Sequence, residues 1–201
     1  MAARTGVVPL TKEASLVILA GGRSTRMGTP KRDLRVGDQT LLEWMVRRLA
    51  PSFAETIVCG ASAPKPARAV ADLRNDGGPL AGIEAGLRSA RTPYVYVVAC
   101  DMPRATAKLG DFLLSRAASH DAAVPVTVLP QPLCAAYSRG AVSKISAFLD
   151  RGGRRVTHVM ESLDVVTVSE ADLAKANIAK DELIDLDTRA DYDAFIASFR
   201  A

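Results

Sequence analysis

Short apolar runs alternate with stretches of helical periodicity along most of the 201-residue sequence. Short, apolar runs of this kind are typical of strands that are covered on both faces. The predicted strands are Leu16–Ala20, Thr56–Cys59, Tyr94–Ala99 and Ala122–Val126, and the predicted helices between them are Leu41–Leu49, Leu80–Arg88 and Leu109–Ser119. This alternation predicts an α/β fold with a single doubly wound, mostly parallel, Rossmann-like sheet and helices on both of its faces.

The pattern changes around Gln131, where two prolines, Pro130 and Pro132, precede the short apolar run Leu-Cys-Ala-Ala-Tyr. We expect this run to form a strand that lies antiparallel to the others. Further helices are predicted around Val142–Leu149, Val156–Glu161 and Arg189–Ser198. Because no internal repeat or linker interrupts the chain, we predict one domain over residues 15–201, preceded by a loose leader over residues 1–14.

Composition and charge narrow the class of protein. The net charge is only +4, from 26 basic and 22 acidic residues, and aromatic residues make up 5% of the chain. A nucleic-acid-binding protein would need a larger charge imbalance and aromatic stacking residues, and no apolar run is long enough to span a membrane. Three widely spaced cysteines fit reduced thiols in a cytoplasm. The sequence therefore predicts a cytoplasmic protein that binds small molecules rather than nucleic acid or membrane.

The first strand runs into a glycine turn followed by cations, in the stretch LVILAGGRSTRMGTPK from Leu16 to Lys31. Ligands of parallel sheets bind beyond the carboxyl ends of the strands, where Gly21 and Gly22 would let backbone N–H groups approach a phosphate. Arg26 and Lys31 would then contact the phosphates of a triphosphate. The alternative is an ordinary tight turn with solvated basic residues.

Two later stretches would lie near the same edge. In NDGGPLAGIEAGL, residues 75–87, Gly78 leaves room for a ligand and Pro79 suits the first turn of a helix. In YVYVVACDMP, Asp101 follows an apolar strand and reaches the carboxyl edge of the sheet. A carboxylate there suits magnesium, which often takes one or two protein ligands beside phosphate and water. The alternative for Asp101 is a turn or helix-capping role.

These motifs resemble a known family. LAGGRSTRMGTPK is similar to the LAGGxSxRMGxxK signature of nucleotidyltransferases of the GT-A-like, nucleotide-diphospho-sugar transferase superfamily. GPLAGI, CDMP, QPLCAAY and FLDRGGRRV further resemble the molybdenum cofactor guanylyltransferases of the MobA type. The resemblance implies transfer of GMP from GTP to molybdopterin with release of pyrophosphate, magnesium as cofactor, and transient contacts with other proteins of cofactor biosynthesis or molybdoenzyme maturation.

The resemblance also implies roles for particular residues. Arg26, Lys31 and Asp101 would be catalytic, and Asp101 and Asp187 would bind magnesium. Gln131, Arg154 and Arg155 would contact the acceptor. The implied nucleotide contacts are Leu19, Ala20, Gly21, Gly22, Lys31, Cys59, Asp76, Gly78, Pro79, Leu80 and Asp101.

The sequence departs from the family pattern at two places. TIVCGAS has Cys59 or Gly60 where the family commonly has an asparagine that contacts the nucleotide. ELIDLDTRADYDAF has Asp185 and Asp187 where asparagines are usual, so Asp187 either binds magnesium or, with Thr188, caps the last helix. Two other functions remain possible besides guanylyl transfer to molybdopterin. One is a related nucleotidyltransferase that uses CTP or another phosphate-bearing acceptor, such as a sugar phosphate, a methylerythritol phosphate or a cobalamin precursor. The other is a nucleotide-binding protein without catalytic activity.

Overall fold

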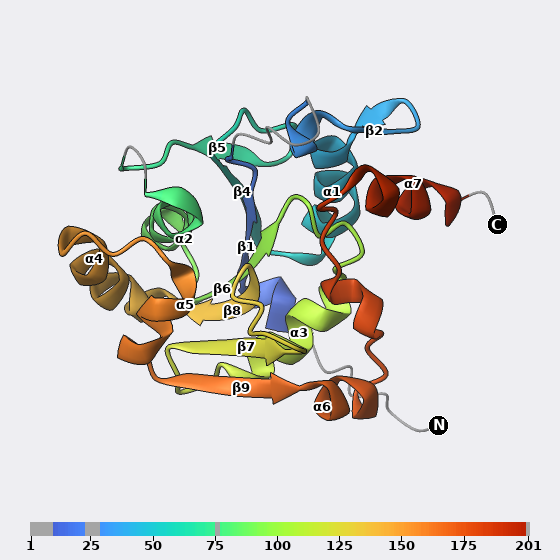
Figure 1. Ribbon diagram of the computed structural model, residues 1–201. Coiled ribbons are helices and arrows are strands. Elements are labelled where there is room, and N and C mark those ends of the chain that lie inside the picture. The colour runs from blue at the N-terminus through green and yellow to red at the C-terminus, as the bar shows by residue number, and fades with distance from the viewer. Residues whose placement is uncertain (1–9, 23–28, 75–76, 200–201) are drawn as a thin grey trace, which may run out of the picture.

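A seven-stranded sheet forms the centre of the molecule in the computed structural model, which describes residues 10–22, 29–74 and 77–199 (Figure 1). The strand order is β5-β4-β1-β6-β8-β7-β9. Only β8 runs against its neighbours β6 and β7, while β1 is parallel to both β4 and β6. The strands are β1 (Ser15–Leu19), β4 (Glu55–Cys59), β5 (Arg68–Val70), β6 (Tyr94–Ala99), β7 (Ala122–Val126), β8 (Cys134–Ser138) and β9 (Val165–Ser169).

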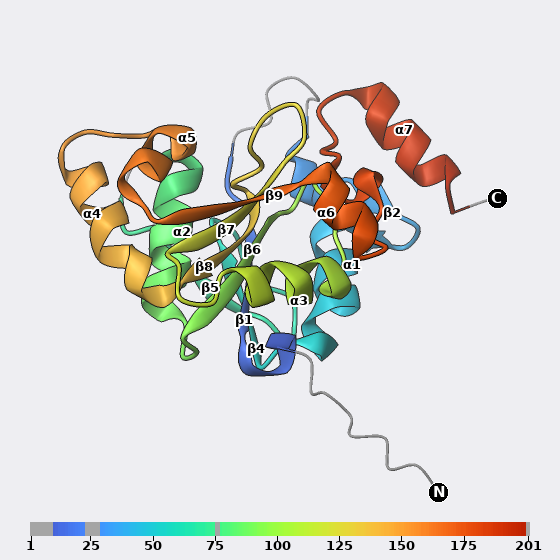
Figure 2. The same ribbon diagram turned by 90° about the horizontal axis from the view of Figure 1, so that it is seen from below.

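Helices cover both faces of the sheet (Figures 1 and 2). One face packs against α1 (Leu41–Leu49), α3 (Ala107–Arg116) and α6 (Glu170–Lys175), while α7 (Arg189–Ala197) packs on α1. The other packs against α2 (Gly78–Ser89), α4 (Val142–Asp150) and α5 (Val156–Val159). The predicted mostly parallel, doubly wound sheet is therefore confirmed, including the antiparallel strand after Gln131.

Strand β1 shows why apolar runs without alternation marked the core. Leu16 and Ile18 point into the core beneath α1 and α3, whereas Val17 and Leu19 point into the core beneath α2. All four side chains are buried. A strand with helices on both faces must be apolar at every position, and burial of this area is the main favourable term for folding.

Several short elements escaped prediction because they are short or only partly buried. The edge strands β5 and β9 have few fully buried residues, and α6 has one. A small hairpin, β2 (Arg35–Val36) and β3 (Gln39–Thr40), precedes α1. Short 3₁₀ helices connect the elements: η1 (Leu10–Glu13), η2 (Lys31–Asp33), η3 (Ala50–Ser52), η4 (Arg139–Ala141), η5 (Met160–Ser162) and η6 (Lys180–Leu183).

The C-terminal segment returns to α1. Trp44 of α1 makes edge-to-face contacts with Phe195 and Phe199, at centroid distances of 5.5 and 5.6 Å. Helix α7 starts with a capping box between Thr188 and Asp191, which satisfies free N–H groups of its first turn. This packing fixes the chain just before α7 close to the carboxyl end of the sheet.

Residues 10–14 of the predicted leader, residues 1–14, lie within the described part of the structure. Leu10–Glu13 form η1, in which Thr11 is buried and its backbone N–H donates to Asp111 of α3. The division into leader and domain stays a prediction. Among the described residues, no helix is both long and apolar enough to cross a membrane.

Candidate nucleotide site at the carboxyl edge of the sheet

Three parallel strands end together at the edge where the sequence predicted a ligand. The backbone N–H of Ala20 donates to the carbonyl of Cys59 at 2.8 Å, and that of Cys100 donates to the carbonyl of Leu19 at 3.0 Å. The ends of β4, β1 and β6 are therefore in register. The residues that follow them, Gly21, Gly60 and Asp101, lie at one edge of the sheet, as parallel topology requires.

Two glycine turns touch at this edge. Gly60 has a φ of +80°, which favours glycine. A Cβ at Gly60 would lie 2.6 Å from the Cα of Gly21 and 2.7 Å from its nitrogen. The backbone after β4 is thus pressed against the turn after β1. Gly60 keeps the Gly21 backbone in place. The sequence had marked this position only as one where the asparagine common in the family is absent.

Lys31 joins two carboxylates that are distant in the sequence. Its Nζ donates to Asp101 Oδ2 at 2.9 Å and to Asp187 Oδ1 at 2.7 Å. Burial opposes the charge of Lys31, but the hydrogen bonds to Asp187 and Asp101 outweigh it, so its pKa is raised. The predicted residues Lys31, Asp101 and Asp187 are therefore brought together, with the lysine charged.

The C-terminal segment delivers Asp187 to this cluster. The backbone N–H of Leu186 donates to the carbonyl of Asp101 at 2.8 Å. Burial, followed by the charges of Asp187 and Asp101, raises the pKa of Asp185. Thr188, not Asp187, provides the side-chain cap of α7. The side chain of Asp187 therefore does not cap α7, and its role as a metal ligand stays a prediction.

Asp72, which sequence reasoning missed, lies on the other side of the glycine turns. A Cβ built on Gly82 would lie 3.6 Å from Asp72 Oδ1, and one built on Gly21 would lie 3.9 Å from Asp72 Oδ2. Neighbouring protein atoms displace water from this carboxylate and raise its pKa. Asp72 follows the short strand β5 as Asp101 follows β6, so the same strand-end argument would have found it had β5 been predicted.

The remaining predicted nucleotide residues differ in what they offer. Gly78 has a φ of +61° and opens α2, with Pro79 in its first turn. Leu80 and Cys59 point into the core, so only their backbone can reach a ligand. Burial raises the pKa of the Cys59 thiol to about 12, which keeps it protonated. Gly22 is exposed and has a φ of +116°.

The predicted acceptor residues do not form one cluster of contacts. Arg154 folds back on α4, where its Nη1 donates to the carbonyls of Leu149 and Gly153 at 3.2 and 2.8 Å. Arg155 is exposed and precedes α5. Gln131 is half-buried in the loop between β7 and β8. Two further predicted residues, Arg26 and Asp76, lie outside the described residues.

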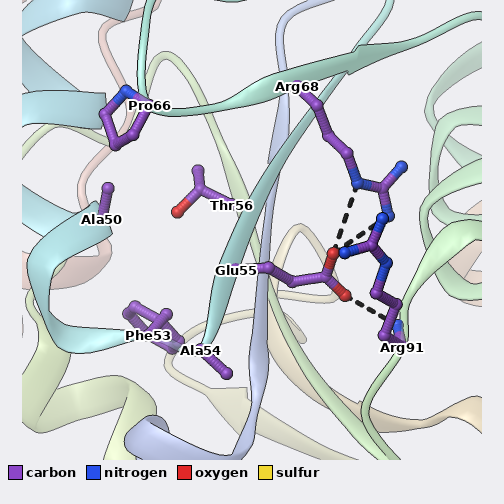
Figure 3. Close-up of a pocket in the computed structure, with 8 residues that line it drawn as sticks. All are labelled: Ala50, Phe53, Ala54, Glu55, Thr56, Pro66, Arg68 and Arg91. Atoms are coloured by element: carbon purple, nitrogen blue, oxygen red, sulfur yellow. Dashed lines mark hydrogen bonds and ion pairs between the residues drawn. The ribbon is translucent and has the colours of Figure 1, made fainter.

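A shallow cavity of about 330 Å³ lies at the opposite end of β4 (Figure 3). Glu55, at the start of this strand, accepts hydrogen bonds from Arg68 and from the backbone of Arg91. Thr56 points away from them toward Ala50 and Pro66. Since Glu55 begins β4 and Cys59 ends it, this cavity is separate from the nucleotide edge.

Fold and site together define an α/β protein in which a glycine turn, a lysine and a strand-end aspartate share the ligand-binding carboxyl edge of a mostly parallel sheet. Comparison with known proteins narrows the class. The family model of the MobA-like NTP transferase domain matches residues 16–166. The chain belongs to this family.

Relatives and solved structures agree with this assignment. The probable molybdenum cofactor guanylyltransferase of Pelotomaculum thermopropionicum is 37% identical over 80% of this chain and 81% of its own. The corresponding protein of Methanosarcina acetivorans is 32% identical over 98% and 97%. The crystal structure of molybdopterin-guanine dinucleotide biosynthesis protein A from Archaeoglobus fulgidus superposes with a TM-score of 0.82 at 25% identity, covering 92% of this chain and 98% of that one.

Proposed function

We propose that the protein transfers GMP from GTP to molybdopterin, in its molybdenum-bearing form, and releases pyrophosphate. The contact of Lys31 with both Asp101 and Asp187, beside the touching Gly21 and Gly60 turns, is the observation that carries this proposal. This cluster combines a cation that can bind phosphate with two carboxylates, at the carboxyl edge of the sheet where ligands bind. The names of the relatives support guanylyl transfer to a molybdenum cofactor.

The reaction joins two phosphates. A terminal phosphate oxygen of the acceptor attacks the α-phosphorus of GTP, a new P–O bond forms, and the bond to the β-phosphate oxygen breaks with pyrophosphate as leaving group. A phosphate monoester is already a nucleophile near neutral pH, so this chain need not supply a base. Its residues position the two substrates and stabilise the charge that develops on pyrophosphate. Lys31 and Arg26 take the second role.

Asp101 and Asp187 are the residues that would hold magnesium. The fit follows from the ammonium of Lys31, a cation that both carboxylates already contact at 2.9 and 2.7 Å. Carboxylate oxygens are also the ligands that magnesium prefers. When bound, magnesium would neutralise phosphate charge and polarise the α-phosphate.

Asp72 would contribute to recognition of guanine. A carboxylate accepts hydrogen bonds only, and guanine presents two adjacent donors, N1–H and its amino group, where adenine does not. Asp72 lies beside Gly21 and Gly82, next to Cys59, which stands where relatives commonly have asparagine. This carboxylate could therefore provide side-chain base recognition that Cys59 cannot.

The cellular setting belongs to the same proposal. Cys59, Cys100 and Cys134 are free and buried, in agreement with a reducing cytoplasm. Transient contacts with proteins of cofactor biosynthesis or molybdoenzyme maturation would bring the acceptor and remove the product.

A nucleotide panel tests the proposal. Purified protein is incubated with molybdopterin and GTP, CTP or ATP, and pyrophosphate release and the dinucleotide product are measured, with Asp101→Asn as control. GTP-dependent formation of the guanine dinucleotide is expected. Preferential incorporation of CMP would overturn the guanylyl assignment, and the absence of pyrophosphate release with every nucleotide would support a purely binding role.

A further inference from the structure

Arg74 makes polar contacts with two helices at once. Its Nε and Nη2 donate to the two carboxylate oxygens of Glu84 at 2.7 and 3.1 Å. Its Nη1 donates to Asp150 Oδ1 at 2.7 Å. A guanidinium suits this task because it presents several donors in a fixed plane, whereas a lysine is a single point charge.

Glu84 holds the Nε and Nη2 groups of Arg74 in a fixed position. Its side chain is only 1% exposed, and Ser146 of α4 also donates to it at 2.6 Å. Hydrogen bonds from Arg74 outweigh the effect of burial and lower the pKa of Glu84 to about 2. Because Glu84 is charged and buried, losing a partner would be costly, and Arg74 is held firmly against α2.

This contact with Glu84 fixes the segment beside the nucleotide edge. Arg74 ends residues 71–74, here called the nucleotide loop, which also contain Asp72. Asp72 lies beside Gly21 and Gly82. The position of the Arg74 backbone thus limits where the Asp72 carboxylate can lie.

The Nη1 group of Arg74 contacts the end of α4, just before the predicted acceptor residues. Asp150 is the last residue of α4, and residues 151–155, here called the acceptor loop, follow it directly. The loop bends back on the same helix end, since Arg154 donates to the carbonyl of Leu149. Helices α2 and α4 lie side by side (Figures 1 and 2), so Arg74 spans the space between the two loops.

We propose that Arg74 is a positioning residue that couples the nucleotide loop to the acceptor loop through Glu84 and Asp150. The role rests on the proposed function, in which these loops face the two substrates. Nucleotide contacts with residues 71–74 act on the segment that Arg74 ends and, through Asp150, on the start of residues 151–155. Coupling between two sites is reciprocal, so the acceptor strengthens nucleotide binding by the same factor.

Three variants separate coupling from simple stabilisation. Asp150→Asn removes the carboxylate that Nη1 contacts, at a position whose side chain is 64% exposed, so folding is preserved. Arg74→Met removes the contacts with both Glu84 and Asp150. Arg88→Met is the matched control, because Arg88 also donates to Glu84 and Ser146 but its polar contacts within the described residues reach neither loop.

Substrate binding is the first readout. In Asp150→Asn we expect the KM for molybdopterin to rise about two- to fivefold, the range that a partly exposed ion pair supports, with kcat unchanged and a smaller rise in the Kd for GTP alone. Arg74→Met should raise both the KM for molybdopterin and the Kd for GTP. Arg88→Met should lower the melting temperature and leave the ratio of the KM for molybdopterin to the Kd for GTP unchanged. An unchanged KM for molybdopterin in Asp150→Asn would overturn the coupling.

Amide hydrogen exchange of the ligand-free protein is the second readout and does not require activity. Asp150→Asn should accelerate exchange in residues 71–74 as well as 151–155, whereas Arg88→Met should accelerate neither. If residues 71–74 exchange as in the wild type, the loops are independent and the proposal is wrong. A wild-type protein inactive with molybdopterin would overturn the proposed function alone, since exchange still decides whether Arg74 couples the loops.

Discussion

Replacing Glu84 by glutamine should destabilise the fold in a pH-dependent way. Glu84 is 1% exposed and accepts hydrogen bonds from Arg74, Arg88 and Ser146. The bonds from Arg74 contribute most to lowering its pKa from 4.5 to about 2, against the opposing effect of burial. Glu84→Gln keeps the shape of the side chain but removes the charge that these groups surround.

The lowered pKa of Glu84 gives the sign and the size of its contribution to the free energy of unfolding. A group whose pKa is lowered by folding contributes stability that is present above its unfolded value and is lost as the pH falls through its folded value. For Glu84 that window runs from 4.5 down to about 2. At about 1.4 kcal/mol for each pH unit, the contribution is about 3 kcal/mol at pH 7 and about 1.4 kcal/mol at pH 3.

Unfolding by urea at several pH values measures this contribution. At pH 7 the variant should be less stable by about 3 kcal/mol, which corresponds to a melting temperature lower by about 6–12 °C in a chain of this size. The difference from wild type should shrink by more than half at pH 3. Glu161→Gln, at an exposed glutamate, should change little at either pH. A difference that stays constant between pH 7 and pH 3 would refute the argument.

Four further predictions address the nucleotide site. Asp101→Asn should abolish turnover with little loss of stability, which paired activity and melting measurements would check; activity within a few-fold of wild type would contradict the metal assignment. Lys31→Ala should slow transfer about 100-fold or more, and normal single-turnover rates with normal GTP affinity would place Lys31 outside catalysis. Gly60→Ala should cost about 1–3 kcal/mol and weaken GTP binding, whereas Gly37→Ala, also at positive φ but in open space, should leave binding intact. Asp72→Asn should narrow the preference for GTP over ATP in competition assays.

The sequence was sufficient for the parts of the fold that depend on continuous burial. Helix α1 begins and ends where its apolar periodicity predicted, from Leu41 to Leu49, and β6 likewise spans Tyr94–Ala99. Strand β5 was missed because only Arg68, Ala69 and Val70 form it and none of them is fully buried. Missing β5 also meant missing Asp72, since its position at a strand end was the only signal that could mark it.

The sequence predicted which residues belong to the site but not which of them contact one another. Strand-end logic places Asp101 at the ligand edge, and a family motif marks Lys31. Their contact with Asp187 depends on the C-terminal segment, which returns through the packing of Phe195 and Phe199 on Trp44 and the burial of Leu186. The bond between Leu186 and Asp101 then fixes the register. Long-range packing of this kind leaves no periodic signal near residue 187.

Charge balance explains why Lys31 lies between carboxylates rather than pointing into solvent. Burial, and then the charges of Asp187 and Asp101, raise the pKa of Asp185, and Lys31 offsets part of this negative charge. A triphosphate, with about four negative charges, would be repelled by these carboxylates if it drew Lys31 away without bringing another cation. Magnesium bound with the nucleotide would offset that repulsion; Asp101 and Asp187 are the residues that would hold it, and Lys31 would then contact phosphate. The proposed roles of Lys31 and Asp101 therefore depend on each other.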